Sequence, residues 1–446
     1  MEIIFNKKIG IWGLGVSGKS IANFLDSKGI EYSTQLDSKF PESFLESNDI
    51  IIPSPGIDLR PWKKYANKFL AEIDFFVHFF TKPTVGVTGT LGKTTITFLL
   101  NELLKKNNLS SIAAGNIGIG MCDIINQQDN LDIAVLELSS FQLEFCKSYT
   151  PRLAVLTNFF PNHLDRHIDL EEYKNAKLNL FKNLTVSDYA LVPIELAHEF
   201  NFINTNIFYF AKNFALLSSS NIHGYPAILG DATSSCHGHP ERAFRRVEGY
   251  FLDNNKVCFW NGLDIKIVTE LNKEHKQKTF FENWLIICAA LNILNCKNFN
   301  VSEDVLLPAH RMEKVIKNEI IFYNDSKSTV IESTLKAVAS CNNPILFLGG
   351  LSKGVDRSNM FEEIKNKVSF VICFGQEAGL LNNLCIKNNI KSCSFKNLED
   401  AVEFCIKFAK KGDEVLFSPG GSSFDLFENY CHRGDRFKEL VNLYFA

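Results

Sequence analysis

Short apolar runs alternate with amphipathic segments of helical length along almost the whole chain. In the first part of the chain the apolar runs cover residues 8–12, 50–52, 84–87, 132–136 and 152–157. Runs of this length separated by helical patterns are typical of parallel strands connected by crossover helices. The pattern therefore predicts an α/β protein built on parallel sheets.

The alternation weakens between residues 214 and 262. Two β-type runs, 249–252 and 257–260, flank a polar turn at residues 253–255 there, which predicts a β-hairpin. A helix is expected near residues 283–295. Further on the alternation resumes, with apolar runs at residues 320–323, 345–348, 370–373 and 415–417.

The length of 446 residues corresponds to about three domains at ~150 residues each. A new strand pattern begins directly after Lys82 and Pro83, and another series of strands begins after residue 298. We therefore expect three domains, at residues 1–82, 83–297 and 298–446.

Charge and cysteine content exclude several classes of protein. Lys and Arg number 47 against 50 Asp and Glu, so bulk charge does not make this a nucleic-acid-binding protein. The twelve cysteines form no Cys-x-x-Cys pair, which favours buried thiols in a reducing, cytoplasmic location. The run Cys236–His239 could hold a metal, but an isolated run of this kind is more often loop surface. No apolar run is long enough to span a membrane, and no targeting segment is expected.

A first glycine-rich turn, at residues 13–18, follows a predicted strand and opens a helix. Asp37 lies 19 residues beyond Gly18. Glycines let the backbone approach a diphosphate at a helix N-terminus, and an acidic residue at this distance can bind a ribose hydroxyl. The pattern fits a dinucleotide, another nucleoside diphosphate conjugate, or a tight turn without a ligand.

A second glycine turn, at residues 86–95, carries a stronger signal. It joins a strand to the helix at residues 96–106 and contains Gly92-Lys93-Thr94-Thr95. Backbone N–H groups and an ammonium group at a helix start surround phosphates, and a hydroxyl group can bind Mg²⁺. Val87 stands where the general P-loop pattern has glycine, yet the context still predicts a nucleotide-phosphate site.

Other polar residues lie near strand ends and admit two interpretations each. Glu137 ends an apolar run and could bind Mg²⁺ beside the phosphate loop, or cap a helix. His163 follows a strand and by itself is typical of a surface loop. Lys177, on a helix expected at residues 171–181, reads locally as part of a solvated face. The turn at residues 418–425 is a weak ligand-site signal at the end of a strand.

Taken together, these segments resemble the Mur ligase family. The matching motifs occur in the family's order and cover nearly the whole chain, at residues 89–95, 115–118, 136–144, 162–167, 173–177, 310–313, 324–329 and 418–434. The run Glu137-Leu138-Ser139-Ser140-Phe141-Gln142-Leu143-Glu144 is similar to that of the D-glutamate-adding member.

The resemblance implies a fold and an activity. The fold would combine an N-terminal Rossmann-like UDP-binding domain, a central P-loop ATPase-like parallel sheet and a C-terminal Rossmann-like domain. The activity would be ATP-dependent addition of D-glutamate to UDP-N-acetylmuramoyl-L-alanine through an acyl phosphate, in cytoplasmic peptidoglycan precursor synthesis. The protein would act as a monomer, with two Mg²⁺ ions and without nucleic acid or membrane.

The resemblance also assigns roles to individual residues. Catalysis would involve Lys93, His163 and Lys177, the last of them carbamylated. ATP would be bound by Gly89, Thr90, Leu91, Gly92, Lys93, Thr94, Thr95, Asn283, Arg311 and Asp325. The two metal sites would use Thr94, Glu137, His163 and Lys177. The UDP substrate would contact Gly15, Val16, Ser17, Asp37, Ser38, Gly56 and Asn116. D-Glutamate would contact Thr329, Lys353, Ser423 and Tyr430.

Four positions depart from the family pattern. They are Leu91, Asn162, Ile286 and Val330, of which Ile286 replaces an asparagine of the nucleotide helix. Two other hypotheses stay open from the residues alone: another ligase of the Mur or folylpolyglutamate type, and a nucleotide-binding regulator without catalysis. The latter would not need the charged set at Lys93, Glu137, His163, Lys177 and Asp325.

Overall fold

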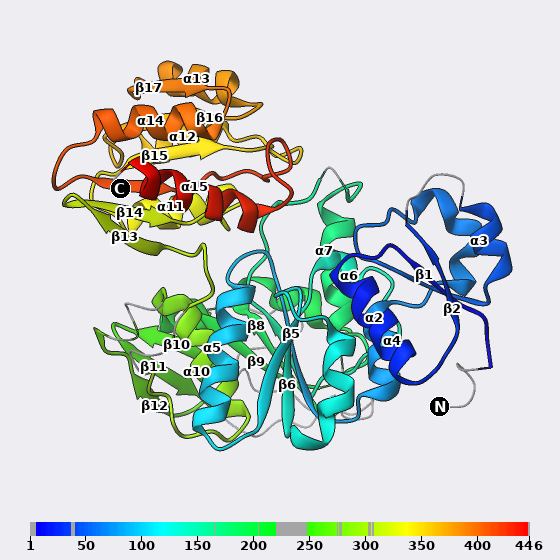
Figure 1. Ribbon diagram of the computed structural model, residues 1–446. Helices are drawn as coiled ribbons and strands as arrows, with labels where there is room; N and C mark the ends of the chain where they lie inside the picture. The colour runs from blue at the N-terminus through cyan, green and yellow to red at the C-terminus, as the bar shows by residue number, and fades with distance from the viewer. Residues whose placement is uncertain are drawn as a thin grey trace. The chain divides into compact units, whose positions relative to one another are not determined.

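The computed structural model confirms the predicted α/β class, with strands arranged in three sheets (Figure 1). It describes residues 6–36, 41–164, 166–203, 205–219, 248–273, 275, 279–301, 305 and 307–444. The chain divides into two compact units. The first contains Met1–Phe160 and Glu171–Leu306, and the second contains Pro161–Leu170 and Leu307–Ala446.

The first sheet, in the first unit, is small and parallel, in the order β2-β1-β3. Its central strand is buried at every position, as expected for a strand covered on both faces. Its strands are β1 (Ile9–Trp12), β2 (Tyr32–Gln35) and β3 (Ile50–Pro53). The helices of this region are α2 (Val16–Ser27), α3 (Glu42–Ser47), η1 (Arg60–Lys68) and α4 (Glu72–Phe79).

The second sheet, also in the first unit, has nine strands in the order β12-β11-β10-β9-β8-β7-β4-β6-β5. From β5 to β10 all neighbours are parallel, and β11 and β12 are antiparallel additions. Its strands are β4 (Thr84–Thr88), β5 (Ser111–Gly115), β6 (Ile133–Glu137), β7 (Leu153–Leu156), β8 (Tyr189–Pro193), β9 (Asn206–Ala211), β10 (Glu248–Asp253), β11 (Lys256–Trp260) and β12 (Ile265–Glu270).

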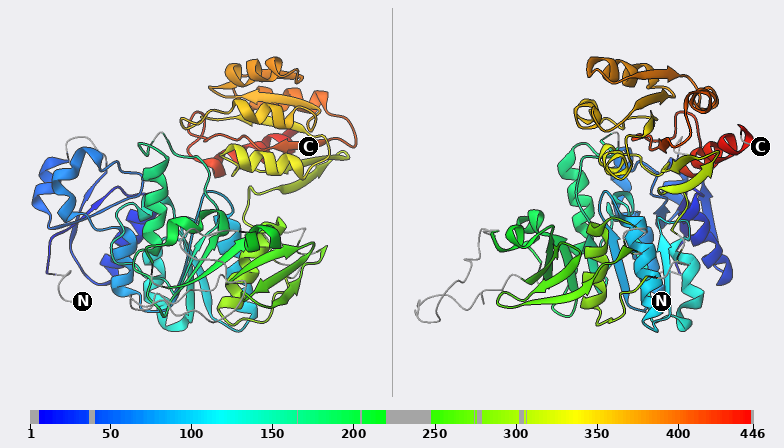
Figure 2. Two further views of the ribbon diagram at one scale, coloured as in Figure 1. Left: turned by 180° about the vertical axis from the view of Figure 1, so that it is seen from behind. Right: turned by 90° about the vertical axis from the view of Figure 1, so that its left-hand side faces the viewer.

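Helices cover this sheet, and α5 and α10 pack against each other on it (Figure 1; Figure 2). Every residue of α10 from Trp284 to Leu291 is buried, because the helix lies between α5 and the strands. The helices are α5 (Lys93–Lys106), η2 (Met121–Asn130), α6 (Ser140–Leu143), α7 (Leu170–Leu178), η3 (Asn179–Phe181), η4 (Ile194–Phe200), α8 (Phe214–Ser219) and α10 (Phe281–Ile293).

The third sheet belongs to the second unit and has the order β13-β14-β18-β15-β16-β17, with only β13 antiparallel. Its strands are β13 (Glu313–Lys317), β14 (Ile320–Asn324), β15 (Ile345–Gly349), β16 (Phe370–Phe374), β17 (Ser392–Phe395) and β18 (Glu414–Phe417). Its helices are α11 (Ile331–Ala339), α12 (Ser358–Ile364), α13 (Ala378–Lys387), α14 (Leu398–Phe408) and α15 (Tyr430–Tyr444).

Separate apolar cores lie on the two faces of the third sheet. One contains residues of α14 and α15 and the other residues of α11, α12 and α13, so helices cover both faces. Phenylalanine fills the first core: the rings of Phe417 and Phe437 are stacked with centroids 4.2 Å apart, and Phe347 lies edge-on to both. This double cover is what a doubly wound sheet requires.

Several predicted elements are confirmed with shifted ends. The hairpin is formed by β10 and β11, with Asn254 at φ +55° in the turn. The helix expected at 96–106 starts three residues earlier, at Lys93. The helix expected at 171–181 is α7, followed by the short helix η3. The domain boundaries at 82/83 and 297/298 stay predictions.

Most cysteine side chains are buried, and within the described residues none forms a disulfide. Burial raises the pKa of the Cys146 thiol to about 12, and it also raises the pKa values of Cys288 and Cys405. The Cys236–His239 run lies outside the described residues. Among the helices that are described, none combines the length and the hydropathy needed to cross a bilayer.

Candidate active site

The predicted phosphate loop, residues 89–92, connects the buried strand β4 to α5 in the first unit. Gly89 and Gly92 have φ values of +140° and +81°, and a Cβ on Gly89 would lie 2.0 Å from the hydroxyl oxygen of Thr157. Only glycine fits such a position without strain. The ammonium group of Lys93 donates hydrogen bonds to the carbonyl oxygens of Gly89 (2.9 Å) and Thr90 (3.1 Å). The loop therefore curls around a cationic group at the start of a helix.

Leu91, which departs from the family pattern, is fixed by its main chain. Its N–H donates to the side-chain oxygen of Asn158 (2.8 Å), and its carbonyl oxygen accepts from the Thr157 hydroxyl (2.7 Å). Neither bond depends on the side chain at position 91. The next helical turn begins with Thr94 and Thr95, both buried.

Asn283 lies directly beside this loop. A Cβ on Gly92 would come within 2.8 Å of the Asn283 side-chain oxygen, and the Asn283 amide donates to the Thr279 hydroxyl (2.7 Å). Ile286, further along α10, is buried in the apolar core instead. Asn283, which is expected to bind nucleotide, thus lies at the loop, whereas Ile286 does not.

Glu137 ends β6, next to β4, in register with Val87. The residue is 2% exposed, and one carboxylate oxygen accepts from the Asn116 amide (3.2 Å). The other oxygen, Oε2, has no hydrogen-bond partner among the residues that the structure describes. A buried anionic oxygen without a partner is costly, and a divalent cation with oxygen ligands would compensate it.

Lys177 is buried rather than solvated, so the surface interpretation of α7 at this position is wrong. Its ammonium group donates to the Gly89 carbonyl oxygen (2.8 Å) and lies 4.4 Å from the centroid of the Tyr173 ring. Burial, followed by the charge of Lys93, holds the pKa of Lys177 well below its usual value, against the opposing effect of Glu137. The amine is therefore close to the phosphate loop and inclined to be neutral.

The N-terminal glycine turn starts α2. A Cβ on Gly18 would lie 1.9 Å from the carbonyl oxygen of Gly13, so the helix packs directly onto the turn. At Gly15, and at Gly56 after β3, a Cβ would meet nothing within 4 Å. Val16 is exposed and Ser17 follows it on the first turn of the helix. The turn is thus open to an approaching ligand; Asp37 and Ser38 lie outside the described residues.

In the second unit, Asp325 follows β14 and is buried. Its Oδ2 accepts hydrogen bonds from the hydroxyls of Ser418 (2.9 Å) and Ser328. Burial raises the pKa of Asp325 to about 6, while these bonds and the charge of Arg311 act in the opposite direction. The Nε atom of Arg311 is buried and has no hydrogen-bond partner within the described part of the chain. Its N–H group is therefore available to donate to an anion.

The residues expected to bind D-glutamate follow three adjacent strands of the third sheet. Thr329 follows β14, Lys353 follows β15 with φ +53°, and Ser423 follows β18. An isolated bridge between Leu351 and Ser422 joins two of these loops. Thr329 lines a small pocket within this unit, whose other lining residues include Val330, Ser352, Arg357 and Gly420.

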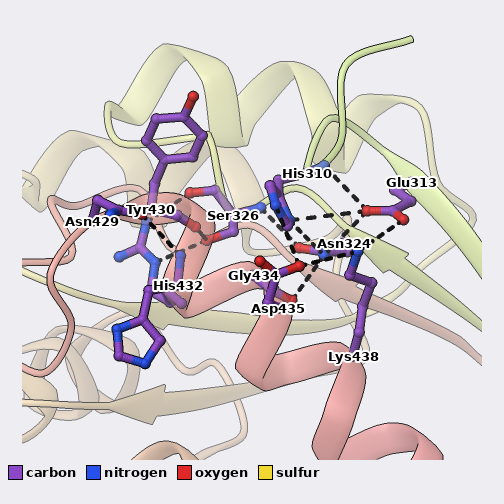
Figure 3. Close-up of polar contacts among 11 residues, drawn as sticks. His310, Glu313, Asn324, Ser326, Asn429, Tyr430, His432, Gly434, Asp435 and Lys438 are labelled. Atoms are coloured by element: carbon purple, nitrogen blue, oxygen red, sulfur yellow. Dashed lines mark hydrogen bonds and ion pairs between the residues drawn. The ribbon is translucent and has the colours of Figure 1, made fainter. Parts of the chain in front are cut away.

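Tyr430 begins α15, which lies against the residues that follow β14 (Figure 3). Its carbonyl oxygen accepts from the Ser326 hydroxyl (2.8 Å), and the Lys327 ammonium lies 4.8 Å from its ring. Arg433, fully buried, donates to the Ser326 carbonyl oxygen (2.7 Å). The Tyr430 ring is thereby fixed near the strand ends of this unit.

His163 belongs to the residues 161–170 that are grouped with the second unit. It has φ +57°, and its N–H donates to the Asn162 side-chain oxygen (2.9 Å). The candidate residues therefore fall into two groups in different units. That both groups form one active site stays a prediction.

Comparisons with known proteins agree with the motifs. The model of the Mur ligase middle domain matches residues 87–222. The chain is 32% identical to the UDP-N-acetylmuramoylalanine–D-glutamate ligase of Protochlamydia amoebophila, over 99% of both chains. The chain belongs to the Mur ligase family. It is also 30% identical to the ligase of the same name from Caldicellulosiruptor bescii, over 98% of this chain and 94% of that one.

Solved Mur ligase structures share the fold. The structure of the MurF ligase of Thermotoga maritima in complex with ADP aligns over 99% of this chain and 99% of that one, with a TM-score of 0.55 and 16% identity. The MurC ligase of the same organism covers 98% of this chain and 100% of that one with a TM-score of 0.56 and 14% identity. Escherichia coli FolC in complex with DHPP and ADP has a TM-score of 0.54 and 14% identity, over 88% of this chain and 100% of that one.

Two polar residues of this Mur ligase were missed by sequence reasoning. Arg433 was seen only as the end of a motif, without a role. Glu72 lies in no glycine turn and no motif, and its carboxyl group is buried near Ser17 and Gln142. An acidic residue inside the apolar run at 70–80 is the one signal that marks it.

Proposed function

We propose that this Mur ligase joins D-glutamate to UDP-N-acetylmuramoyl-L-alanine and converts ATP to ADP and phosphate. The observation that carries the proposal is the identity of about a third to curated D-glutamate ligases over nearly the full length of both chains. Such a match includes the regions that select substrates as well as the phosphate loop. The ADP named for two structural neighbours supports ATP as the nucleotide.

The chemistry explains why ATP is required. A free carboxylate is a poor electrophile, so the alanyl carboxylate is first phosphorylated to an acyl phosphate. The amine of D-glutamate then attacks the carbonyl carbon, and the tetrahedral intermediate expels phosphate. Positioning and charge neutralisation dominate phosphoryl transfer. Lys93 and the N-terminus of α5 would supply both for the ATP phosphates.

Mg²⁺ fits the residues beside the phosphate loop. Thr94 and the unpaired Oε2 of Glu137 would hold the ion, which when bound neutralises phosphate charge. The described residues contain no group of three or more His, Cys, Asp or Glu side chains that could hold a metal by themselves. We propose that a modified lysine supplies an oxygen ligand for a second ion.

Carbamylated Lys177 would provide that ligand together with His163. The neutral amine attacks CO₂, a proton leaves the nitrogen, and a carbamate anion forms. The depressed pKa of Lys177 favours this step because only the unprotonated amine reacts. Carbamylation would also convert a buried amine, close to Lys93, into an oxygen-donating anion.

The remaining assignments follow the motifs. The UDP moiety would bind at Gly15, Val16, Ser17, Gly56 and Asn116, with Asp37 and Ser38. Asn283, Arg311 and Asp325 would bind ATP outside the loop. Thr329, Lys353, Ser423 and Tyr430 would bind D-glutamate, whose two carboxylates suit a lysine and hydroxyl donors. We propose a cytoplasmic monomer with domains at 1–82, 83–297 and 298–446; light scattering tests the oligomeric state.

One assay tests the function. Phosphate release is measured with ATP, Mg²⁺ and UDP-N-acetylmuramoyl-L-alanine, adding D-glutamate, L-lysine or meso-diaminopimelate in turn. Release and a product of the expected mass should appear only with D-glutamate, and Lys93→Ala should abolish both. Release with another amino acid would overturn the substrate assignment. If none of the three amino acids gives phosphate release, the result would favour a nucleotide-binding regulator without catalysis.

A further inference from the structure

Glu72 is a buried acid that the reaction does not use. It is the first residue of α4, and its side chain is 3% exposed. Its Oε2 accepts a hydrogen bond from the Gln142 amide at 3.3 Å. The Ser17 hydroxyl and the Met121 N–H also face this carboxyl group. Its Oε1 has no partner among the described residues.

The groups around Glu72 come from the starts of three different elements. Ser17 is the second residue of α2, Met121 the first of η2 and Gln142 the third of α6. Donors from three elements can stabilise a carboxyl group where water is excluded. Glu72 therefore ties together segments that are about 50 to 70 residues away from it in sequence.

The same segments are packed tightly against each other. A Cβ on Gly120, just before η2, would lie 2.3 Å from the Cβ of Ser20 on α2. The Ser20 hydroxyl accepts from the N–H of Asp123 (2.9 Å). The start of α2 thus has little freedom to move relative to η2.

The Gln142 carboxamide is fixed at both ends. Its oxygen accepts from the N–H (3.0 Å) and hydroxyl (3.1 Å) of Ser139, which closes a capping box at the start of α6. Its nitrogen donates to Glu72. The Glu72 carboxyl group thus contacts the Ser139–Gln142 segment directly and lies beside Ser17, at the end of the glycine turn.

We propose that Glu72 is a positioning residue for the nucleoside diphosphate of the UDP substrate: its buried carboxyl group holds the start of α2 against η2 and Gln142, and so fixes the backbone N–H groups of the Gly15–Ser17 turn that receive the diphosphate. The inference rests on the proposed function, since it requires that this turn binds the UDP moiety. Glu72 itself need not touch the substrate.

The surroundings of Glu72 favour the neutral form of its carboxyl group. Burial raises its pKa, and the charge of Asp123 acts in the same direction, against the nearby groups of Ser17, Gln142 and Met121. An amide of the same shape keeps an oxygen that can accept from the Gln142 amide. Glutamine should therefore replace Glu72, whereas an apolar side chain should not.

The test compares five variants by calorimetric titration with UDP-N-acetylmuramoyl-L-alanine and by steady-state kinetics. In Glu72→Met and Gln142→Met the dissociation constant for this ligand should rise about tenfold, in line with a lost buried hydrogen bond of ~1.4 kcal/mol. The KM for ATP and kcat at saturating UDP substrate should stay within about twofold of the wild type, since the phosphate loop is untouched. Glu72→Gln should retain wild-type affinity.

Asp74→Asn is the matched control. Asp74 lies two residues further along α4, is equally buried, and accepts from the N–H groups of Lys147, Ser148 and Tyr149. Asp74→Asn should lower the melting temperature without changing affinity for the UDP substrate. Glu72→Met with Gln142→Met should weaken binding no more than either change alone.

Three results would overturn the inference. They are unchanged affinity in Glu72→Met or in Gln142→Met, an equal rise in the KM for ATP, and a loss of affinity in Asp74→Asn as large as in Glu72→Met. If Glu72→Met does not fold, Gln142→Met decides the same question. Absence of wild-type turnover with D-glutamate would count against the proposed function, whereas calorimetric binding tests Glu72 without any turnover.

Discussion

At the scale of single residues, burial decides what the charged groups of the site can do. Lys177 would be an ordinary surface lysine from its local sequence, yet the fold buries it against the Gly89 carbonyl oxygen and the Tyr173 ring. A motif match could assign it a role, but the residue pattern of α7 could not predict its environment. The loop that buries it lies 88 residues away in sequence.

Lys177→Ala should abolish turnover and should partly recover it when short-chain carboxylates are added. The carboxylate would occupy the space of the lost carbamate and supply an oxygen ligand. Lys174→Ala is the control, because Lys174 lies on the same helix but pairs with Glu171 and Glu199. Initial rates of ADP formation measure both variants. Normal turnover of Lys177→Ala would refute the carbamate role.

Asp325 should make the second unit less stable as the pH rises. Its pKa is about 6 in the folded protein against an ordinary value of 3.8, so folding favours the protonated form. The stability it contributes is complete below pH 3.8 and is lost as the pH rises to about 6, a change of about 3 kcal/mol. Asp325→Asn should lack this loss. Urea unfolding of both proteins at pH 4 and pH 7.5 measures it, and parallel pH profiles would contradict it.

At the scale of secondary-structure elements, close approaches fix how helices sit on the third sheet. Gly434 on α15 lies so close to His310 that a Cβ there would be 2.2 Å from the His310 Nδ1. The Asn324 amide donates to the Gly434 carbonyl oxygen (3.0 Å), and its nitrogen lies 3.1 Å from the same ring atom (Figure 3). The helix thus packs on His310 and on the end of β14 at a position that has no side chain.

Gly434→Ala should destabilise the protein by about 1–3 kcal/mol, because the methyl group overlaps a buried ring. Gly379→Ala is the comparison, since a Cβ on Gly379 of α13 would meet nothing within 4 Å. Alanine is the better helix former, so this second change should be neutral or stabilising. Melting temperatures measure the two effects. Equal melting temperatures would show that α15 can shift to accept the methyl group.

Elements with a strong apolar pattern could be predicted, and half-exposed ones could not. The all-buried strands β4 and β15 and the hairpin of β10 and β11 follow directly from their residues. The edge strand β2 (Tyr-Ser-Thr-Gln) has no buried position, and β12 also lies at an edge with none. Such strands form because their backbone pairs with a neighbouring strand. Since that neighbour can be far away in sequence, the strand's own residues show no hydrophobic pattern that would predict it.

At the scale of the whole molecule, the glycine turns were predictable because each one is continuous in sequence. Residues 89–95 and the turn at Gly15–Ser17 are each predicted to bind phosphates from a local motif, and both assignments stay predictions. In contrast, Glu72 contacts Gln142 and Arg433 contacts Ser326 across 70 and 107 residues of sequence, and these contacts arise only when the chain is folded. Sequence therefore indicates where ligands bind better than what holds the binding segments in place.

Ligands should stabilise the enzyme through separate sites. At a concentration about 100 times its dissociation constant, a ligand adds about 2.7 kcal/mol to the stability of the state that binds it. Mg²⁺-ADP and UDP-N-acetylmuramoyl-L-alanine should each raise the melting temperature of the wild type. Lys93→Ala should lose the shift with Mg²⁺-ADP alone. Loss of both shifts would show that the two sites are not independent.

The buried thiols have a practical consequence. Because Cys146, Cys288 and Cys405 hold almost no thiolate at neutral pH, alkylating reagents can reach them only when the surrounding segment opens. Cys146 and Cys288 belong to the first unit and Cys405 to the second. The native cysteines therefore report local opening of the chain. Alkylation rates measured for each peptide by mass spectrometry would map this opening without an added probe.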